Sequence, residues 1–450
     1  MFRRPARDKG AVAAPLLASL ILASVVQALA PRTALIADAR TYDAIAQGLA
    51  SDDSYELSRA VDGLGMRGYA YPLIIAAVYG IAGFDPGAVE WMQAAVFVPL
   101  TTLLIYLAGR EAFSRRTGLI AAWLFALWLP AAWYSLWLTI ETTLNLMAAI
   151  LLALLAAALA RGSPRLAILA GSASGLLSIS HAAFQFLWIV LLVALTVYLW
   201  IRERRRFALA GFFALGTAAI ILPYMVFTAA AHLPHLGEGA RGYGGGGGWT
   251  FWIGSRWQTD FTLGPGDYEA GDLYGPGALV ELGKKIDQGR VHVEPHLLKT
   301  IRAKLARPDA EQLTLTDGDY YRAGLENLLD RPGKWPRKLG RNAETLFLVP
   351  RDLNFLPEDP LPSQTWFRPL WRPLSAMLAV LSLAGLFYVL ARRRDDVILV
   401  VPLVFQLLLL MVTHADYRYI IPLWSSMFLL AGAALAALPP VRAAPNRERR

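Results

Sequence analysis

The sequence predicts an all-α membrane protein whose chain crosses the bilayer about ten times. Of its 450 residues, 56% are hydrophobic and only 17% are charged, whereas an ordinary globular chain carries roughly a quarter of charged residues. Long stretches hold almost no charge, and they are long enough to cross a bilayer as helices. These observations place the chain among the polytopic membrane proteins.

Ten apolar stretches qualify as membrane spans. They cover residues 12–31, 91–109, 118–136, 140–160, 166–180, 183–200, 207–229, 374–391, 397–413 and 418–438. The first is long for the core of a signal peptide, so we expect it to remain as an uncleaved span. The apolar stretch 71–83 is shorter than the ~20 residues needed to cross, and we interpret it as an interfacial or re-entrant segment.

Basic residues follow the ends of alternate spans. Arg110, Arg115 and Arg116 follow the second span, whereas the polar stretch 32–70 holds more acidic than basic residues. Because short cytoplasmic loops carry an excess of Lys and Arg, both termini are predicted to be cytoplasmic and 32–70 to be external. This distribution accounts for the net charge of +9, so we expect no nucleic-acid partner.

The predicted spans divide the chain into three parts. Residues 1–229 form an N-terminal transmembrane module that includes the outer loop 32–70, residues 230–373 form an external domain, and residues 374–450 form a C-terminal transmembrane module. Two helical stretches, 276–306 and 316–348, are expected in the external domain. Thr316 and Asp317 are candidate caps for the second stretch, which should break at Arg331-Pro332-Gly333. A glycine-rich stretch, 237–248, precedes both and is either a flexible hinge or a backbone cradle for phosphate.

An amphipathic helix is predicted directly after the first span. Tyr42, Ile45, Ala46 and Leu49 recur at helical spacing, and Asp38 would lie just before this helix, near its positive end. An acidic side chain there can bind a metal ion or take a proton from an acceptor hydroxyl or amine. The simpler alternative is that Asp38 only caps the helix.

Three further polar residues lie at predicted outer ends of spans. Glu141 begins the span 140–160 and either faces a cavity or reaches the interface. His181 lies in an outer turn, where it either contacts a phosphate or metal ion or forms a structural hydrogen bond. Arg418, the only basic residue in the outer loop before the last span, would suit an anionic partner such as a lipid phosphate. The neighbouring Tyr419 is a possible aromatic-belt residue. Together with Arg67, these residues map to one side of the membrane and predict one outward-facing site.

Two classes of chemistry are excluded or disfavoured by the sequence. The chain has no cysteine, which excludes disulfides, thiolate metal sites and cysteine nucleophiles. It has no Walker-type or Rossmann loop either, so a bound nucleotide is not expected.

Six short motifs occur in chain order: Asp38 four residues before Tyr42, Arg67-Gly68-Tyr69-Ala70-Tyr71-Pro72-Leu73, Leu107-Ala108-Gly109-Arg110-Glu111-Ala112-Phe113, Glu141, Tyr320-Tyr321-Arg322 and Tyr417-Arg418-Tyr419-Ile420-Ile421-Pro422. In this order they resemble the lipid-linked-sugar-dependent glycosyltransferases of the GT-C superfamily. The likeness is greatest to the bacterial family 39 and aminoarabinose-transferase type, which is related to protein O-mannosyltransferases. The chain departs from the pattern at Ala39, where many relatives have a second acidic residue, and at His181, where relatives often have Lys or Arg. The Trp-Trp-Asp pattern of oligosaccharyltransferases is absent.

The resemblance implies transfer of a sugar from a polyprenyl-phosphate carrier to a lipid, glycan or protein acceptor on the outer, periplasmic face of a bacterial inner membrane. Asp38 and Glu141 would be the catalytic residues. The substrate-binding residues would be Tyr42, Asp43, Arg67, Tyr71, His181, Arg418 and Tyr419, with Arg67, Arg418 and His181 holding the carrier phosphate. A divalent cation is possible, although the sequence contains no clear ligand cluster. The rival predictions are a membrane transporter or lipid flippase and a non-catalytic scaffold.

Overall fold

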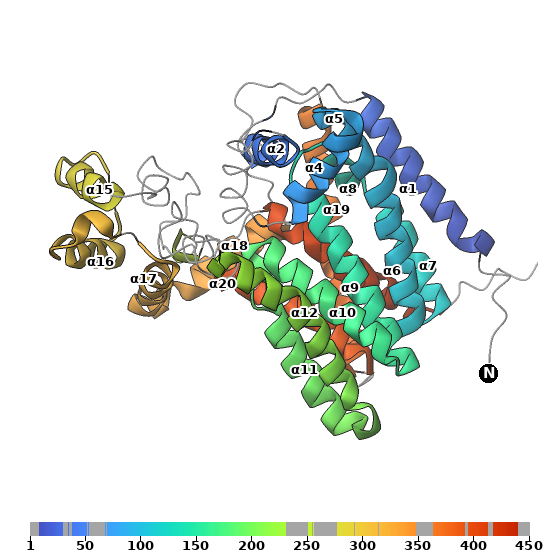
Figure 1. The fold of residues 1–450 in the computed structure, drawn as a ribbon. Coiled ribbons are helices and arrows are strands. Elements are labelled where there is room, and N and C mark those ends of the chain that lie inside the picture. The colour runs from blue at the N-terminus through green and yellow to red at the C-terminus, as the bar shows by residue number, and fades with distance from the viewer. Residues whose placement is uncertain are drawn as a thin grey trace, which may run out of the picture.

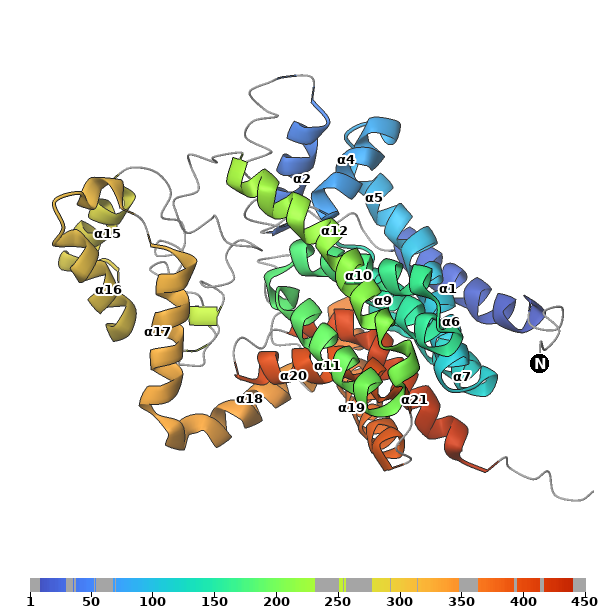
Figure 2. The same ribbon diagram turned by 60° about the horizontal axis from the view of Figure 1, so that its bottom comes forward.

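The computed structural model describes residues 9–29, 35, 38–51, 53, 68, 70–230, 251–253, 255, 277–291, 293–313, 315–347, 363–391, 395–412 and 417–439. In these residues every regular element is helical. Figures 1 and 2 show a large helical bundle with a smaller group of helices to one side of it. The all-α prediction is therefore confirmed.

Seven helices in the described residues are long and apolar enough to cross a membrane. They are α1 (Lys9–Leu29), the continuous rod of α5 (Pro86–Met92), η2 (Gln93–Phe97) and α6 (Val98–Ala112), α9 (Glu141–Arg161), α11 (Leu187–Arg202), α12 (Ala208–Ala230), α19 (Ser363–Ala391) and α21 (Trp424–Ala437) with the preceding turn η10 (Tyr417–Leu423). Each coincides with a predicted span.

The other three predicted spans are shorter helices. They are α10 (Pro164–Ser180), α20 (Val401–Val412) with the preceding turn η9 (Asp395–Val400), and the pair α7 (Arg115–Ala126) and α8 (Leu129–Tyr134). The stretch 118–136 was expected to be one continuous helix, but it is interrupted where Trp128 adopts an extended backbone. Pro130, which lacks an N–H, stands in the first turn of the new helix α8.

Helix α9 lies at the centre of the bundle and is buried on most of its circumference between α6, α10 and α21. Beside it, α10 and α12 pack so closely that their glycines are required. A Cβ added to Gly171 would lie 2.0 Å from the Phe213 carbonyl oxygen, and one added to Gly216 would lie 1.9 Å from that of Ile168. Helix α10 can therefore pack this closely on α12 only because Gly171 and Gly216 have no side chain. The position of the turn at the C-terminus of α10 depends on this packing.

The two ends of α9 differ in chemistry. At its C-terminal end, Glu111 accepts hydrogen bonds from Arg161 at 2.8 Å and from Arg110 at 2.7 Å. Arg206 donates to the Leu159 carbonyl at 2.6 Å. Arg110 follows the predicted span 91–109, Arg161 follows the span 140–160, and Arg206 lies after the span 183–200. The basic ends of these three spans thus meet at one end of the bundle. Because the 21-residue α9 is about 31 Å long, its N-terminus at Glu141 lies at the opposite end.

Helices α2 (Asp38–Leu49) and α4 (Ala70–Ala82) pack together at the Glu141 end. Helix α2 begins at Asp38, so Asp38 is its first residue and does not precede it as expected. Tyr42, Ile45 and Ala46 are buried, as their spacing predicts. Helix α4 has 13 residues, so it is about 20 Å long and shorter than the bilayer core of ~30 Å.

The group of helices beside the bundle contains α15 (Ala278–Asp287), α16 (Pro295–Leu305), α17 (Asp317–Asp330) and α18 (Trp335–Phe347). The expected helical stretch 276–306 is interrupted, because Gly289 turns the chain with a φ of +68°. Thr316 caps α17 through a capping box with Asp319. Trp252, Leu279, Leu297, Ile301 and Tyr320 are buried in a separate small core. The predicted external domain thus has a core of its own.

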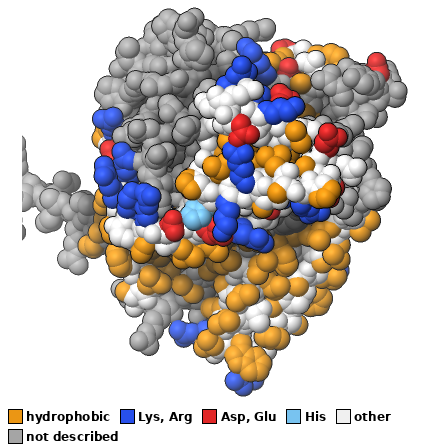
Figure 3. Space-filling model, turned by 90° about the vertical axis from the view of Figure 1, so that its left-hand side faces the viewer, with side chains coloured by type: hydrophobic (Ala, Val, Ile, Leu, Met, Phe, Trp, Pro, Cys, Tyr) orange, Lys and Arg blue, Asp and Glu red, His pale blue; other side chains and the backbone are white. Residues whose placement is uncertain are grey.

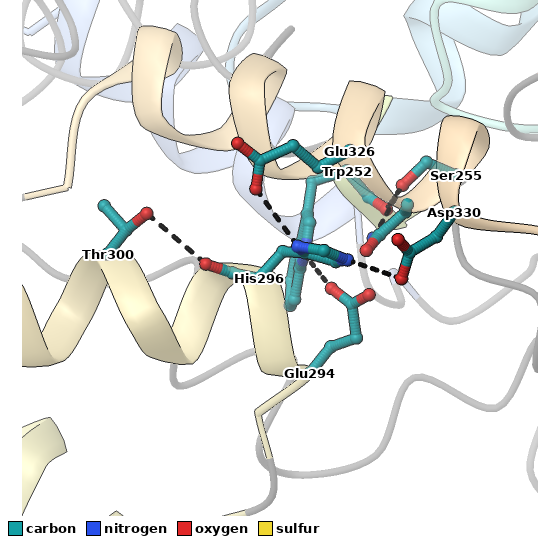
Figure 4. Close-up of polar contacts among 8 residues, drawn as sticks. Trp252, Ser255, Glu294, His296, Thr300, Glu326 and Asp330 are labelled. Atoms are coloured by element: carbon teal, nitrogen blue, oxygen red, sulfur yellow. Dashed lines mark hydrogen bonds and ion pairs between the residues drawn. The ribbon is translucent and has the colours of Figure 1, made fainter.

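His296 joins α16 to α17 (Figure 4). Its Nδ1 lies 3.0 Å from Glu326 Oε2, and its Nε2 lies 2.9 Å from Asp330 Oδ2. The hydrogen bond with Asp330 raises the pKa of His296. The nearby Glu294 accepts a hydrogen bond from the Trp252 indole at 3.0 Å.

Candidate active site

Three charged side chains from distant parts of the chain meet at the end of the bundle that holds α2. An Nη1–H of Arg418, in η10, donates to Oδ2 of Asp38 at 2.8 Å. Nε of Arg418 lies 3.8 Å from Oε1 of Glu141, the first residue of α9. One guanidinium thus stands between two carboxylates that were both predicted to be catalytic.

The three side chains differ in their exposure. The side chains of Asp38 and Arg418 are 23% and 31% exposed, whereas that of Glu141 is 5% exposed. Asp38 and Arg418 are therefore partly open to solvent, whereas Glu141 is almost fully enclosed. In the described part of the chain, Oε2 of Glu141 has no hydrogen-bond partner.

A buried hydrogen bond supports this group from below. One turn after Glu141, Oδ1 of Asn145 accepts a hydrogen bond from Oγ of Ser425 at 2.7 Å. Ser425 lies on α21, two helical turns after Arg418, and both residues of the pair are buried. This bond ties α9 to α21 and thereby fixes how Glu141 and Arg418 approach each other.

His181 and Tyr419 lie beside the guanidinium. The rings of His181 and Tyr419 meet edge to face, with centroids 5.6 Å apart, and the Arg418 guanidinium carbon lies 5.3 Å from the Tyr419 ring centroid. Nδ1 of His181 accepts a hydrogen bond from the backbone N–H of Ala183 at 3.2 Å. Of the two predicted roles of His181, phosphate or metal contact and a structural hydrogen bond, the structure shows the hydrogen bond. The ring of His181 also lies beside the predicted site.

Asp43 is held by neighbours on α2 and α4. It accepts hydrogen bonds from the Tyr79 hydroxyl and, at 2.9 Å, from the Gln47 amide. Burial and the hydrogen bond with Asp43 raise the pKa of Tyr79, so this hydroxyl keeps its proton and acts as the donor. These contacts indicate that Asp43 joins α2 to α4.

Tyr42 and Tyr71, both predicted to bind substrate, contact each other. Their rings lie edge to face with centroids 5.0 Å apart. Both are buried, and Tyr71 donates to Oε1 of Gln93 at 3.4 Å. Gln93 in turn donates to the carbonyls of Ser135 and Trp137, at 3.2 and 2.9 Å. The buried tyrosine pair therefore packs α2 against α4.

Arg67 and the glycine-rich stretch 237–248 lie outside the described residues. The neighbouring Gly68 is described, and it lies against the backbone of Ser180, directly before His181. A Cβ on Gly68 would be 2.3 Å from the Ser180 carbonyl oxygen. The chain just after Arg67 thus passes next to the site.

No group of three or more His, Asp or Glu side chains suited to a metal ion occurs among the described residues. The divalent cation therefore stays a prediction.

Sequence analysis did not identify Asn145, Ser425, Gln93 or Tyr79. Asn145 and Gln93 carry a recognisable signal, because each is a polar residue inside a predicted apolar span, where such residues face protein and not lipid. Tyr79 and Ser425 are common in apolar helices, so their partners appear only in the folded chain.

No family model matches this chain, and no curated protein matches it. Among solved structures, the chain is similar to the oligosaccharyltransferase of Archaeoglobus fulgidus in its apo form, with a TM-score of 0.50 and 15% identity over 93% of this chain and 50% of that chain. It is also similar to the Archaeoglobus fulgidus oligosaccharyltransferase AglB in complex with an inhibitory peptide and a dolichol-phosphate (TM-score 0.49, 14% identity, 94% and 50% of the two chains). A third similar structure is ArnT from Cupriavidus metallidurans bound to undecaprenyl phosphate (TM-score 0.41, 16% identity, 95% and 78% of the two chains).

At these identities the likeness concerns the fold. The chain spans about half the length of the oligosaccharyltransferases that it resembles. The apo oligosaccharyltransferase shares the helical membrane fold over 93% of this chain, which confirms the predicted class of an all-α polytopic membrane protein.

Proposed function

We propose that this protein is a membrane glycosyltransferase that moves a sugar from a polyprenyl-phosphate carrier to an acceptor. The observation that carries the proposal is the Asp38–Arg418–Glu141 group, in which one guanidinium lies between two carboxylates at one end of a membrane bundle. Sugar transfer from a lipid phosphate needs a base for the acceptor and a cation for the departing phosphate. This group supplies both.

Asp38 is the base in this proposal. Its carboxylate is partly exposed, so an acceptor hydroxyl or amine can approach it and lose its proton as the bond to the sugar forms. In that step the bond between the sugar carbon and the phosphate oxygen breaks, and the carrier phosphate leaves with the electron pair.

Arg418 holds the carrier phosphate. A guanidinium has five N–H donors in a fixed planar fork, so it can hold a carboxylate and a phosphate oxygen at the same time. Negative charge grows on the phosphate as it leaves, and a preorganised cation stabilises that charge. Glu141, buried beneath, orients Arg418 and keeps it aligned with the carrier.

The sidedness of the reaction is part of the proposal. Because the arginine-rich end of the bundle suits the cytoplasm, the opposite end, with Asp38 and Arg418, faces the outer, periplasmic side of a bacterial inner membrane. A carrier lipid delivers its sugar there without a nucleotide donor. A lipid, a glycan and a protein are all acceptors compatible with this site.

A comparison of membranes with and without the gene identifies the sugar product that is lost when the protein is missing. Purified full-length protein in liposomes should then form this product from a polyprenyl-phosphate-linked donor, and it should form none from a nucleotide sugar. Movement of labelled lipid across the bilayer without any sugar transfer would instead support the flippase alternative.

A further inference from the structure

We propose that a corner of the external helices rests on the anionic headgroup surface of the bilayer in which the protein is embedded. The corner consists of Arg322, Leu325, Leu329, Arg331, Lys334 and Arg337, and we call it the basic corner. It does not depend on the function proposed above.

The position of α18 sets the depth of the basic corner. Asn342 donates hydrogen bonds to the carbonyls of Met411 and Leu410, at 2.6 and 3.3 Å, in the last turn of α20. These carbonyls have no partner within their own helix, so Asn342 caps the end of a membrane helix. Because the ends of apolar helices lie near the bilayer surface, α18 lies near the level of the headgroups.

The inner face of α18 is packed on the membrane bundle. Asn342 is buried, and Leu346 is part of the same core as the spans. At the start of α18, the Trp335 indole donates to the Leu328 carbonyl of α17 at 3.0 Å. This hydrogen bond stabilises the angle between α17 and α18. Because α18 packs on the bundle, α17 has a defined position beside it.

The outward face of α17 exposes two large apolar side chains. Leu325 is 52% exposed and Leu329 is 66% exposed. They are four residues apart and lie on the same face as Arg322, whereas Leu328 points into the protein. Helix α17 is not a candidate span, and exposed leucines beside the surface of a bilayer are suited to its interfacial region.

The charges around these leucines fit an anionic surface. Arg322, Arg331, Lys334 and Arg337 are exposed, and none forms an ion pair within the described ranges. Glu326 and Asp330, the acidic residues among them, both contact His296 instead. Basic side chains next to a bilayer are attracted by anionic lipids, and salt screens this attraction.

Figure 3 shows the molecule from the side that carries the external helices. Basic side chains gather along the border between the polar part and the broad hydrophobic surface below it. A bilayer around that hydrophobic surface would bring its headgroups to this border. Apolar and basic groups at one border are the combination that binds anionic lipid surfaces.

The test uses the full chain in nanodiscs, made either of phosphatidylcholine alone or with phosphatidylglycerol. Because the chain has no cysteine, Leu329→Cys provides a single thiol for a nitroxide spin label. The contact of the label with dissolved oxygen, which concentrates in lipid, is compared with its contact with a water-soluble nickel complex. The control is Gln288→Cys at the exposed end of α15.

We expect the label at Leu329→Cys to favour oxygen severalfold more than the label at Gln288→Cys in phosphatidylglycerol discs. This preference should fall in high salt, and it should fall in the same protein carrying Lys334→Gln and Arg337→Gln. A Leu329→Cys label as exposed to nickel as the control would overturn the proposal. Equal lipid contact in both kinds of disc, whatever the salt, would also overturn it, because headgroup charge would then have no role.

Discussion

Arg418 and Asp38 are 380 residues apart in the sequence, yet Nη1 of Arg418 lies 2.8 Å from Oδ2 of Asp38. The contact joins the start of α2 to the turn before the last span. It makes Arg418 the centre of the candidate site, because the same guanidinium also faces Glu141.

The first prediction concerns the shape of the cation. Arg418→Lys keeps the charge but replaces a planar fork with a single ammonium. We expect folded protein whose KM for the lipid-linked donor rises by about tenfold to a hundredfold, which corresponds to the loss of one charge-assisted hydrogen bond. Steady-state kinetics with a purified donor measure this change. An unaltered KM would reduce Arg418 to an anchor between α2 and α9.

The second prediction concerns topology and uses the absence of cysteine in the chain. Gln288→Cys in the external helices should react with a membrane-impermeant maleimide in intact spheroplasts. Arg165→Cys, at the start of α10 and the arginine-rich end, should react only after permeabilisation. The reverse pattern would place the site on the cytoplasmic side.

The third prediction concerns the packing of α10 on α12. Gly216→Ala would place a methyl group 1.9 Å from the Ile168 carbonyl, so the helices must separate, and overpacking typically costs about 1–3 kcal/mol or more. Gly211→Ala on the same helix has no atom within 4 Å of its new Cβ and serves as the matched control. Thermal unfolding in detergent should show a clearly lower Tm for Gly216→Ala alone, and equal values for the two variants would contradict the packing.

The fourth prediction concerns pH and His296. The hydrogen bond with Asp330 raises the pKa of His296, so folding favours the protonated imidazole. Glu326 and Glu294 also lie near this imidazole ring. The resulting stability is fully present below the unfolded pKa of about 6.5 and is lost as the pH rises through the higher folded pKa. Hydrogen exchange of α16 and α17 in the full chain should therefore speed up as the pH rises through that range, after correction for intrinsic exchange rates. His296→Gln should abolish this pH dependence, and an unchanged profile in that variant would assign it to another group.

Much of the architecture follows from the sequence, because length and hydropathy determine a membrane span. Seven of the ten predicted spans are helices long and apolar enough to cross a membrane, and the buried face of α2 and the Thr316 cap also agree with the structure. The interruption of 118–136 was missed although Pro130 is visible in the sequence, because a proline in an apolar stretch is also compatible with a continuous membrane helix.

The candidate site was predictable only as a set of residues on one side of the membrane. Topology placed Asp38, Glu141, His181 and Arg418 at the same end, but it does not specify which side chains touch. The pairing of Arg418 with Asp38, and that of Asn145 with Ser425, depends on how α2, α9 and α21 pack. The roles of these residues in catalysis and binding stay predictions.

The central claim is that Asp38 acts as the base, and Asp38→Asn tests it most directly. Asn keeps the shape of the side chain and still accepts a hydrogen bond from Arg418, but it cannot take the acceptor proton. General-base assistance is worth about 10²–10⁴-fold, so sugar transfer from a lipid-linked donor should fall by about that factor while Tm stays near the wild-type value. Asp43→Asn, whose carboxylate is held by Tyr79 and Gln47, is the matched control and should retain much more transfer. Wild-type transfer by Asp38→Asn would contradict the claim and leave Asp38 as a structural partner of Arg418, with Glu141 the remaining candidate.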